Sequence, residues 1–155
     1  MLKDIIIAKE YPEKVIPLLD SAQFEICVMM YYWGYYSYAG KSGVQKINYA
    51  IKSALTRGVK VNVILHCGSP VDHLKKINSE TYNHLTSWGA RVKWNNRGGT
   101  CHAKMIIIDK NIAIIGSHNF SKRSMGSNIE TSVILEGSGE IRRLYDFFNL
   151  KFSHL

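Results

Sequence analysis

The stretch of sequence that decides the fold is Cys101–Ser121, which reads CHAKMIIIDKNIAIIGSHNFS. Two apolar runs within it, residues 105–108 and 112–115, are rich in isoleucine, a β-branched residue that favours strands. The Asp-Lys-Asn sequence between the runs leaves room only for a tight turn. The stretch therefore predicts a β-hairpin.

A two-residue Lys-Asn loop would set the register of this hairpin. Counting back from such a loop along an antiparallel ladder places Lys104 opposite Ser117 and His102 opposite Asn119. Directly opposed residues share a face of the sheet, and so do residues two apart on one strand. We therefore expect an ammonium, a hydroxyl, an imidazole and an amide to project from one side of the sheet at the open end of the hairpin.

These groups suit a phosphate ester. A lysine supplies positive charge, asparagine and serine supply neutral donors, and a histidine can attack phosphorus or move a proton. In the same register Asp109 lies on the opposite face, beside the turn. We therefore expect Asp109 to anchor the turn rather than to react.

The order of these residues is similar to a known signature. The chain resembles the phospholipase D superfamily, whose members cut or transfer phosphodiesters without a metal, in the HKD pattern His102-x-Lys104-x4-Asp109-x6-Gly116-Ser117-x-Asn119. The segment Asn128-Ile-Glu130 resembles the acidic position that follows this pattern, and residues 54–64 resemble the helix-to-strand step before it. In size the chain resembles the small nucleases and phosphodiesterases that carry one such motif.

The resemblance implies a role for each matched residue. It implies catalytic positions at His102, Lys104, Asp109 and Glu130, and substrate-binding positions at Lys104, Ser117 and Asn119. In this interpretation His102 attacks phosphorus and forms a phosphohistidine. Glu130 would accept a hydrogen bond from the ring of His102 and so select its tautomer. No metal and no other cofactor is expected, because few carboxylates lie near the motif.

One motif per chain is too few for this chemistry. A second histidine has to protonate the leaving oxygen, and the chain offers only one convincing motif. The second histidine should then come from an identical subunit related by a twofold axis. We therefore expect a homodimer with the active site at the subunit interface.

Length and charge narrow the choice of substrate. At 155 residues the chain, 1–155, is expected to form a single phospholipase D-like domain. A net charge of +8 favours polyanions, with nucleic acid ahead of acidic membrane. The leading hypothesis is a metal-independent phosphodiesterase that cleaves DNA or RNA with low sequence specificity. The alternatives are a phospholipase or phosphatidyltransferase acting on lipid, and a nucleic-acid-binding module that no longer cuts.

Neither the cysteines nor the remaining histidines show the spacing of a metal site. The three cysteines are odd in number and form no CxxC pair, so no disulfide framework or zinc site is indicated. The other histidines are expected to be structural or surface groups: His66, His73, His84, His118 and His154. No stretch is long enough to span a membrane and no signal-peptide layout is present. We expect a cytoplasmic protein without stable membrane insertion, with an export segment ahead of Met1 left open.

The rest of the chain alternates strands and helices. Predicted strands are residues 5–8, 24–30, 59–65, 91–94 and 129–135, and predicted helices are residues 12–21, 46–57, 71–88 and 140–152. With the hairpin, this order predicts an α/β sandwich in which a mixed β-sheet is flanked by helices on both faces. The aromatic run Tyr31–Tyr38 could stack bases or pack in the core or at a subunit interface, and the sequence leaves both open.

Overall fold

The computed structural model describes residues 1–37, 41–68, 73–96 and 99–155. Its main elements are β1 (Leu2–Ile7), α1 (Tyr11–Asp20), β2 (Glu25–Met30), α2 (Gly43–Thr56), β3 (Lys60–His66), α3 (His73–Ser87), β4 (Arg91–Asn95), β5 (Lys104–Ile108), β6 (Ile112–Gly116), β7 (Thr131–Glu136) and α4 (Gly139–His154). A short 3-10 helix, Ala8–Glu10, joins β1 to α1.

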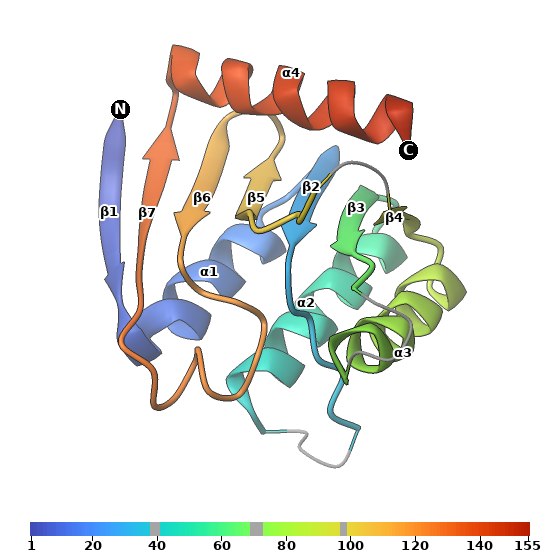
Figure 1. Cartoon of the computed structure of the whole chain (residues 1–155). Helices are drawn as coiled ribbons and strands as arrows, with labels where there is room; N and C mark the ends of the chain where they lie inside the picture. The colour runs from blue at the N-terminus through green and yellow to red at the C-terminus, as the bar shows by residue number, and fades with distance from the viewer. Residues whose placement is uncertain (38–40, 69–72, 97–98) are drawn as a thin grey trace.

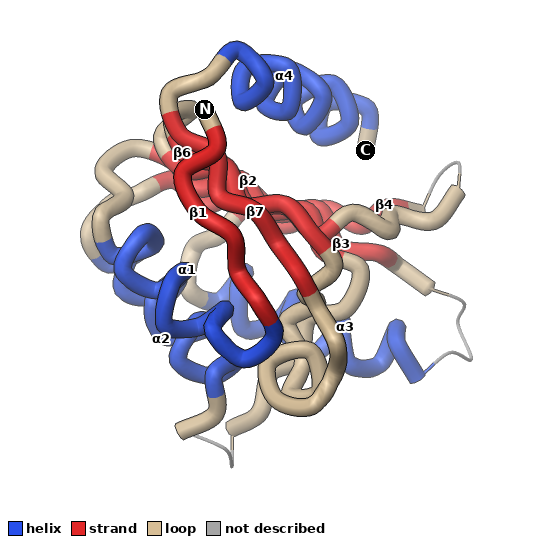
Figure 2. Tube along the Cα trace, turned by 90° about the vertical axis from the view of Figure 1, so that its left-hand side faces the viewer, coloured by secondary structure: helices blue, strands red, loops and turns tan. Residues whose placement is uncertain are grey.

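The strands form one seven-stranded sheet in the order β1-β7-β6-β5-β2-β3-β4. Strands β2, β3 and β4 run parallel to one another, and each remaining pair of neighbours is antiparallel. Helices α1, α2 and α3 lie on one face of the sheet and α4 lies on the other (Figures 1 and 2). The predicted mixed sheet with helices on both faces is therefore confirmed.

Alternation along each strand divides the core between the two faces. On β2, Ile26 and Val28 belong to the apolar cluster shared with α1, α2 and α3, whereas Cys27 and Met29 belong to the cluster under α4. Residues two apart share a face, so every buried strand feeds both clusters. From α4 the second cluster receives the buried Ile141, Phe148 and Phe152, with Leu144 and Tyr145 partly buried, as its periodicity predicted. Burial of each large apolar side chain contributes roughly 1.5–3 kcal/mol.

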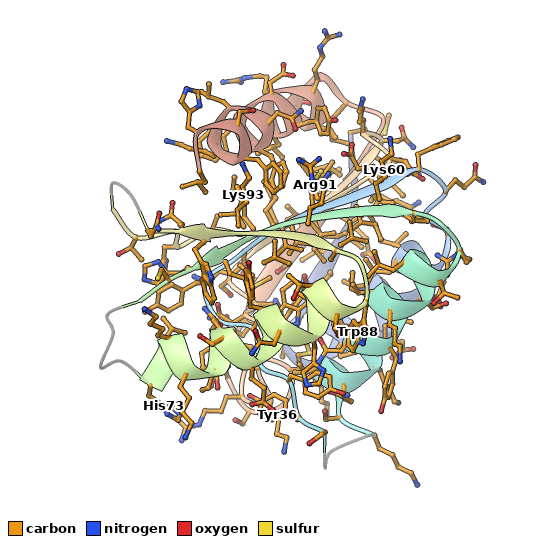
Figure 3. The ribbon with its side chains drawn as sticks, turned by 90° about the vertical axis from the view of Figure 1, so that its right-hand side faces the viewer. Tyr36, Lys60, His73, Trp88, Arg91 and Lys93 are labelled. Carbon is orange, nitrogen blue, oxygen red and sulfur yellow. The ribbon has the colours of Figure 1, made fainter. Side chains whose placement is uncertain are left out.

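Two cations of β4 fasten the C-terminal end of α4 to the sheet. Arg91 and Lys93 project from β4 on the side facing α4 (Figure 3). The ammonium of Lys93 donates to the carbonyl of Phe152 at 2.6 Å, and it lies 4.7 Å from the centroid of that ring. The last carbonyls of a helix lack partners within the helix and favour positive charge, so this contact stabilises the helix end.

Every predicted strand and helix is present, with shifted ends. Strand β1 begins at Leu2 rather than at residue 5. Helix α2 begins at Gly43 rather than at residue 46, because the hydroxyl of Ser42 accepts a hydrogen bond from the N–H of Gln45 at 3.2 Å and caps the helix. The predicted start of α3, residues 71–72, lies outside the described residues. In the part of the chain that is described, no helix is long and apolar enough to cross a membrane.

The predicted register of the β5–β6 hairpin is wrong by one residue. Ile108 pairs with Ile112, and the ladder ends at the pair Met105 and Ile115. The expected pairing of Lys104 with Ser117, and of His102 with Asn119, is therefore not formed. Those residues lie at or beyond the end of the ladder, so other contacts must place them.

The cause of the shifted register is Asp109. Its N–H donates to the carbonyl of Glu25 at 2.9 Å, which pairs this residue with the start of β2 rather than with β6. Asp109 and Lys110 both have positive φ, at 51° and 57°, and with Asn111 they make a three-residue loop. A contact between segments far apart in the chain thus sets the turn, and local turn preferences alone would not predict it.

Candidate active site

Apart from Asp109, the signature residues lie at the edge of the sheet where β2 and β3 end, at the lower end of these strands in Figure 1. Met30, the last residue of β2, lies between Leu65 on β3 and Lys104 on β5. Tyr31 follows Met30 and His66 follows Leu65, so both residues lie beside the segment that leads into β5. The carboxyl ends of parallel strands are a common place for ligand sites in α/β sheets.

Lys104 is the buried cation of this edge. The residue is only 9% exposed, its ammonium donates to the carbonyl of His102 at 2.7 Å, and it lies 5.2 Å from the centroid of the Tyr31 ring. Burial lowers the pKa of Lys104, although the negative charge of Glu130 opposes this effect. An ammonium with two further N–H donors is therefore held at the rim of the sheet.

His102 presents an exposed imidazole beside Lys104. Its ring lies 4.9 Å from that of Tyr31, with an angle of 58° between the two planes. Among the described residues, the ring nitrogens of His102 have no hydrogen-bond partner. The expected hydrogen bond from His102 to Glu130 is thus absent from the chain, because other groups surround that carboxylate.

Glu130 lies just before β7 and is only 8% exposed. Its carboxylate accepts hydrogen bonds from the hydroxyl of Ser117, from the hydroxyl of Ser124 at 2.8 Å and from the amide of Asn128 at 3.1 Å. Burial alone would raise the pKa of this carboxyl, but the three hydrogen bonds outweigh burial and hold the pKa below its usual value. Glu130 is therefore an ionised group that organises the loop between β6 and β7.

Ser117 is hydrogen-bonded within the loop between β6 and β7, and the substrate-binding role expected of it stays a prediction. Its hydroxyl proton is donated to Glu130, and its oxygen accepts from the N–H of Thr131 at 3.1 Å. A hydroxyl has a single proton, so Ser117 has none left for a phosphate in this arrangement. The neighbouring Gly116 allows the close approach of β6 and β7, because a Cβ there would collide with the Ser132 hydroxyl and the Thr131 carbonyl.

Asn119 presents a donor at the same edge. Its side-chain oxygen accepts from the N–H of Tyr32 at 3.2 Å. Since a backbone N–H can only donate, this contact identifies the oxygen and directs the amide NH2 elsewhere. Asn119 is thus bound to the residue that follows Tyr31, which brings a neutral donor to the edge where Lys104 and His102 lie.

Asp109 lies at the other end of β5, at the hairpin turn. Its carboxylate accepts three backbone hydrogen bonds, each 2.8 Å long, from the N–H groups of Gln23, Phe24 and Glu25. The catalytic position that the resemblance implied for Asp109 stays a prediction. The residue anchors the turn, as its place beside the turn predicted.

Sequence reasoning gave no site role to three residues that lie at this edge, His66, Asn78 and Ser124, and it considered Tyr31 only as part of the aromatic run. His66 was expected to be structural or a surface group, yet its ring stacks on that of Tyr31. Both residues follow the last buried positions of adjacent parallel strands, and this is the signal that could have found them. Ser124 and Asn78 have no such signal.

His118 is structural, as expected. It is fully buried, and its Nε2 lies 2.8 Å from the carbonyl oxygen of Ala8 while its Nδ1 lies 2.8 Å from the hydroxyl of Ser132. A carbonyl only accepts, so Nε2 carries the proton. Burial lowers the pKa of His118, which keeps the ring neutral in this position.

The aromatic run packs within the chain wherever it is described. Trp33 is fully buried and donates from Nε1 to Asn48 at 2.7 Å. Tyr35 stacks on His84 with 3.6 Å between ring centroids. Tyr38 lies outside the described residues. Packing thus accounts for these rings, whereas a role in base stacking stays a prediction.

Comparisons with known proteins identify the family of the chain. The sequence family described as "Cardiolipin synthase, PLD-like domain" matches residues 15–152. The chain belongs to the phospholipase D superfamily. Solved structures of two proteins are similar to this superfamily member over nearly their whole length. Nuc from Salmonella typhimurium, a phospholipase D family member, is 19% identical, with a TM-score of 0.79 and coverage of 97% of this chain and 94% of Nuc.

NucT from Helicobacter pylori is similar in the same way, with 20% identity, a TM-score of 0.76 and coverage of 96% of this chain and 94% of NucT.

The curated relatives that are similar in sequence are longer proteins. Cardiolipin synthase B of Escherichia coli O6:H1 is 28% identical over 102 residues, which are 65% of this chain and 24% of that protein. Cardiolipin synthase B of Shigella flexneri is 26% identical over 137 residues, 86% of this chain and 30% of that protein. The chain thus spans less than a third of the length of either relative.

Proposed function

We propose that this member of the phospholipase D superfamily is a metal-independent phosphodiesterase that cleaves DNA or RNA with low sequence specificity. The observation that supports this proposal is the arrangement at the end of β2: an exposed imidazole, His102, beside the buried ammonium of Lys104, with the amide donor of Asn119 on the same edge. A phosphodiester needs a nucleophile and cationic or neutral donors for its oxygens, and this edge supplies both.

The first half of the reaction forms a phosphohistidine. A nitrogen lone pair of neutral His102 forms the N–P bond while the ester P–O bond breaks in line with it. Lys104 and the amide NH2 of Asn119 stabilise the negative charge on the non-bridging oxygens. The leaving oxygen takes a proton from His102 of the partner subunit.

The second half restores the enzyme. Water attacks phosphorus, the N–P bond breaks, and the pair of electrons returns to the nitrogen of His102. The partner subunit's His102, neutral after the first half, accepts the proton of the attacking water. The net change is hydrolysis of one phosphodiester bond without a change in oxidation state.

The proposed reaction requires a homodimer whose active site lies at the subunit interface. Two exposed isoleucines near the site support a subunit contact there. Ile129, next to Glu130, is 99% exposed, and Ile7, which pairs with Thr131, is 58% exposed. Apolar side chains in such positions are often covered by a partner.

Charge favours nucleic acid as the substrate. The chain has 20 lysine and arginine residues against 12 acidic residues. Positive charge of this size favours binding to polyanions. TrmBL2, an archaeal chromatin protein with a novel mode of DNA binding, shares the fold at a TM-score of 0.61 over 99% of this chain and 53% of that protein. At 16% identity this likeness concerns the fold, and the charge of the chain remains the main argument.

A lipid substrate is the second candidate. The curated relatives named cardiolipin synthase favour a phosphatidyl ester, which the same chemistry would cleave or transfer. A binding module that does not cut is the third possibility, but binding a phosphate requires the charge of Lys104 and not an exposed histidine beside it. The intact His102 therefore supports an enzyme.

Metal independence rests on how the nearby carboxylates are used. Asp109 accepts three backbone hydrogen bonds at the far turn, and Glu130 accepts three from side chains. Neither is arranged as a ligand pair for a divalent ion. Over the described ranges, no group of three or more His, Cys, Asp and Glu side chains could hold a metal ion. We expect cleavage to persist in a chelator.

One experiment tests the function and its rivals together. Pure protein is incubated in excess EDTA with labelled DNA, labelled RNA and vesicles of phosphatidylglycerol, and an alkaline quench preserves any phosphohistidine. We expect nucleic acid to be cut by the wild type and by His154→Ala, a matched change of an exposed histidine, and not by His102→Ala. Turnover of lipid alone would establish the second candidate. Activity that EDTA abolishes and magnesium restores would contradict the proposed mechanism.

A further inference from the structure

Tyr31 lies where three segments of the site meet. It follows β2, whose last residue, Met30, is flanked by Leu65 of β3 and Lys104 of β5. The Tyr31 ring stacks on the ring of His66, with centroids 5.1 Å apart and an angle of 22°. The same ring lies 4.9 Å from the ring of His102 and 5.2 Å from the ammonium of Lys104. One side chain thus contacts both of the groups on which the chemistry depends.

A buried amide holds the backbone on which this ring is mounted. Asn78 of α3 is fully buried, and its NH2 donates to the carbonyls of Tyr31 at 2.8 Å and His66 at 2.9 Å. Its side-chain oxygen accepts from the N–H of Trp33 at 2.9 Å. One side chain therefore ties the ends of β2 and β3 to each other, and a ring mounted there loses little further freedom on binding substrate.

His66 supports the ring from the side of β3. Its Nδ1 accepts a hydrogen bond from the N–H of Cys101 at 3.3 Å, so the neutral imidazole carries its proton on Nε2. This bond also fixes the start of the segment that leads to His102, because Cys101 is the residue before it. The stack of His66 on Tyr31 is thereby coupled to the backbone of the nucleophile.

We propose that Tyr31 is a positioning residue, which orients the imidazole of His102 for attack and keeps Lys104 in its cationic form beside it. The inference rests on the proposed function for the roles of these two groups. The negative face of an aromatic ring stabilises a nearby ammonium, most strongly where water is excluded, and Lys104 is such a buried ammonium. The tilted contact with His102 restricts the rotamers of an otherwise exposed side chain.

The test compares variants that separate the effect of the aromatic ring from the effect of its apolar volume. Tyr31→Phe keeps the ring, Tyr31→Leu keeps apolar volume without the ring, and Tyr35→Leu removes a ring that stacks on His84 and is therefore the matched control. The substrates are bis(4-nitrophenyl) phosphate, a simple diester, and the nucleic acid that the wild type cuts. Circular dichroism and melting temperature show that each variant is folded. If Tyr31→Leu does not fold, Tyr31→Met replaces it.

We expect Tyr31→Phe and Tyr35→Leu to retain kcat within about twofold. Tyr31→Leu should lower kcat about tenfold with little change in KM. A tenfold fall in kcat is the size expected for losing a desolvated cation–π contact. The alkaline limb of the kcat profile should move to lower pH in Tyr31→Leu, because Lys104 then holds its proton less tightly among Glu130, Cys101 and His102. A rise in KM with unchanged kcat would overturn the proposal and assign the ring to substrate stacking.

A measurement without substrate distinguishes failure of this inference from failure of the proposed function. In 15N-labelled protein, the ring resonances of His102 should shift in Tyr31→Leu and stay unchanged in Tyr35→Leu, because only the first variant removes a ring beside His102. Unchanged His102 resonances in Tyr31→Leu would overturn the positioning role. If the wild type cuts none of the diesters, the proposed function fails, and these spectra still decide whether Tyr31 orients His102.

Discussion

At the scale of single residues, Lys104 is under opposing influences. Burial of its ammonium lowers the pKa below the ordinary lysine value of 10.5, and the charge of Glu130 opposes this to a smaller extent. Lys104 must be protonated to stabilise phosphate charge, so activity is lost as the pH rises through its pKa.

The alkaline limb of the kcat/KM profile should therefore lie below pH 10.5. The measurement is a pH series with the chromogenic diester, alongside Lys104→Arg. Arginine stays protonated throughout this range, so the limb should be missing in that variant even if its rate is lower. If the wild type and Lys104→Arg have the same alkaline limb, a group other than Lys104 is responsible for it.

Glu130 should link stability to pH. Its pKa is held below the ordinary value of 4.5, so ionised Glu130 contributes stability above pH 4.5, and this contribution is lost as the pH falls through the lowered pKa. Glu130→Gln should lower the free energy of unfolding by about 1–3 kcal/mol at pH 7, since it disturbs buried hydrogen bonds. The gap between the two proteins should narrow below pH 4.5.

Urea unfolding between pH 7 and pH 3 measures this gap. The control is Glu136→Gln, because Glu136 forms an exposed ion pair with Lys3 at 2.9 Å and such pairs contribute little. A gap between Glu130→Gln and the wild type that is constant with pH would refute the assignment of an ionised, hydrogen-bonded Glu130.

At the scale of elements, the β5–β6 hairpin separates stability from catalysis. From the turn, Asp109 accepts hydrogen bonds from three N–H groups just before and at the start of β2, whereas His102 and Lys104 lie at the other end of β5. Asp109→Asn tolerates the same positive φ but replaces one accepting oxygen with a donor. It should cost about 1–3 kcal/mol of stability and leave kcat per folded molecule unchanged.

The check for Asp109→Asn combines chemical denaturation with active-site titration on the folded fraction. Asp20→Asn, at the exposed end of α1, is the control and should change neither quantity. A large fall in kcat of folded Asp109→Asn, with stability unchanged, would show that Asp109 has a catalytic role.

At the scale of the whole molecule, the net charge of +8 should dominate binding to nucleic acid. Affinity should fall steeply as salt rises, because bound counterions are released from the polymer. His102→Ala should bind with affinity close to that of the wild type, since it removes the nucleophile and leaves the lysines. Gel shifts across a salt series measure both effects. Weak binding that does not respond to salt would favour the lipid candidate.

An active site shared by two subunits leads to a second prediction at the scale of the whole molecule. Light scattering should show a dimer. Heterodimers of wild-type and His102→Ala subunits, isolated with two different tags, should have little activity, because each reaction needs one histidine to attack and another to donate a proton. Heterodimers that keep half of the wild-type rate would mean that each subunit works alone, and the shared site would have to be abandoned.

The sequence by itself determined the elements and the family. Alternation of apolar residues on β2 and the period of α4 predicted their buried faces, because periodicity reports directly which side chains a strand or helix can bury. The HKD pattern from His102 to Asn119 indicated the family from sequence alone, since so many residues at fixed spacing seldom match a family signature by chance.

Only the tertiary structure decided how the site is assembled. The hairpin register depends on Asp109 pairing with the start of β2, and the partners of Glu130 depend on the loop that brings Ser117 and Ser124 to it. Tyr31 reaches His102 because β2 lies between β3 and β5. These contacts join segments far apart in the chain, and pairing between distant segments leaves no local pattern in the sequence, because each partner is chosen by the packing of the whole sheet.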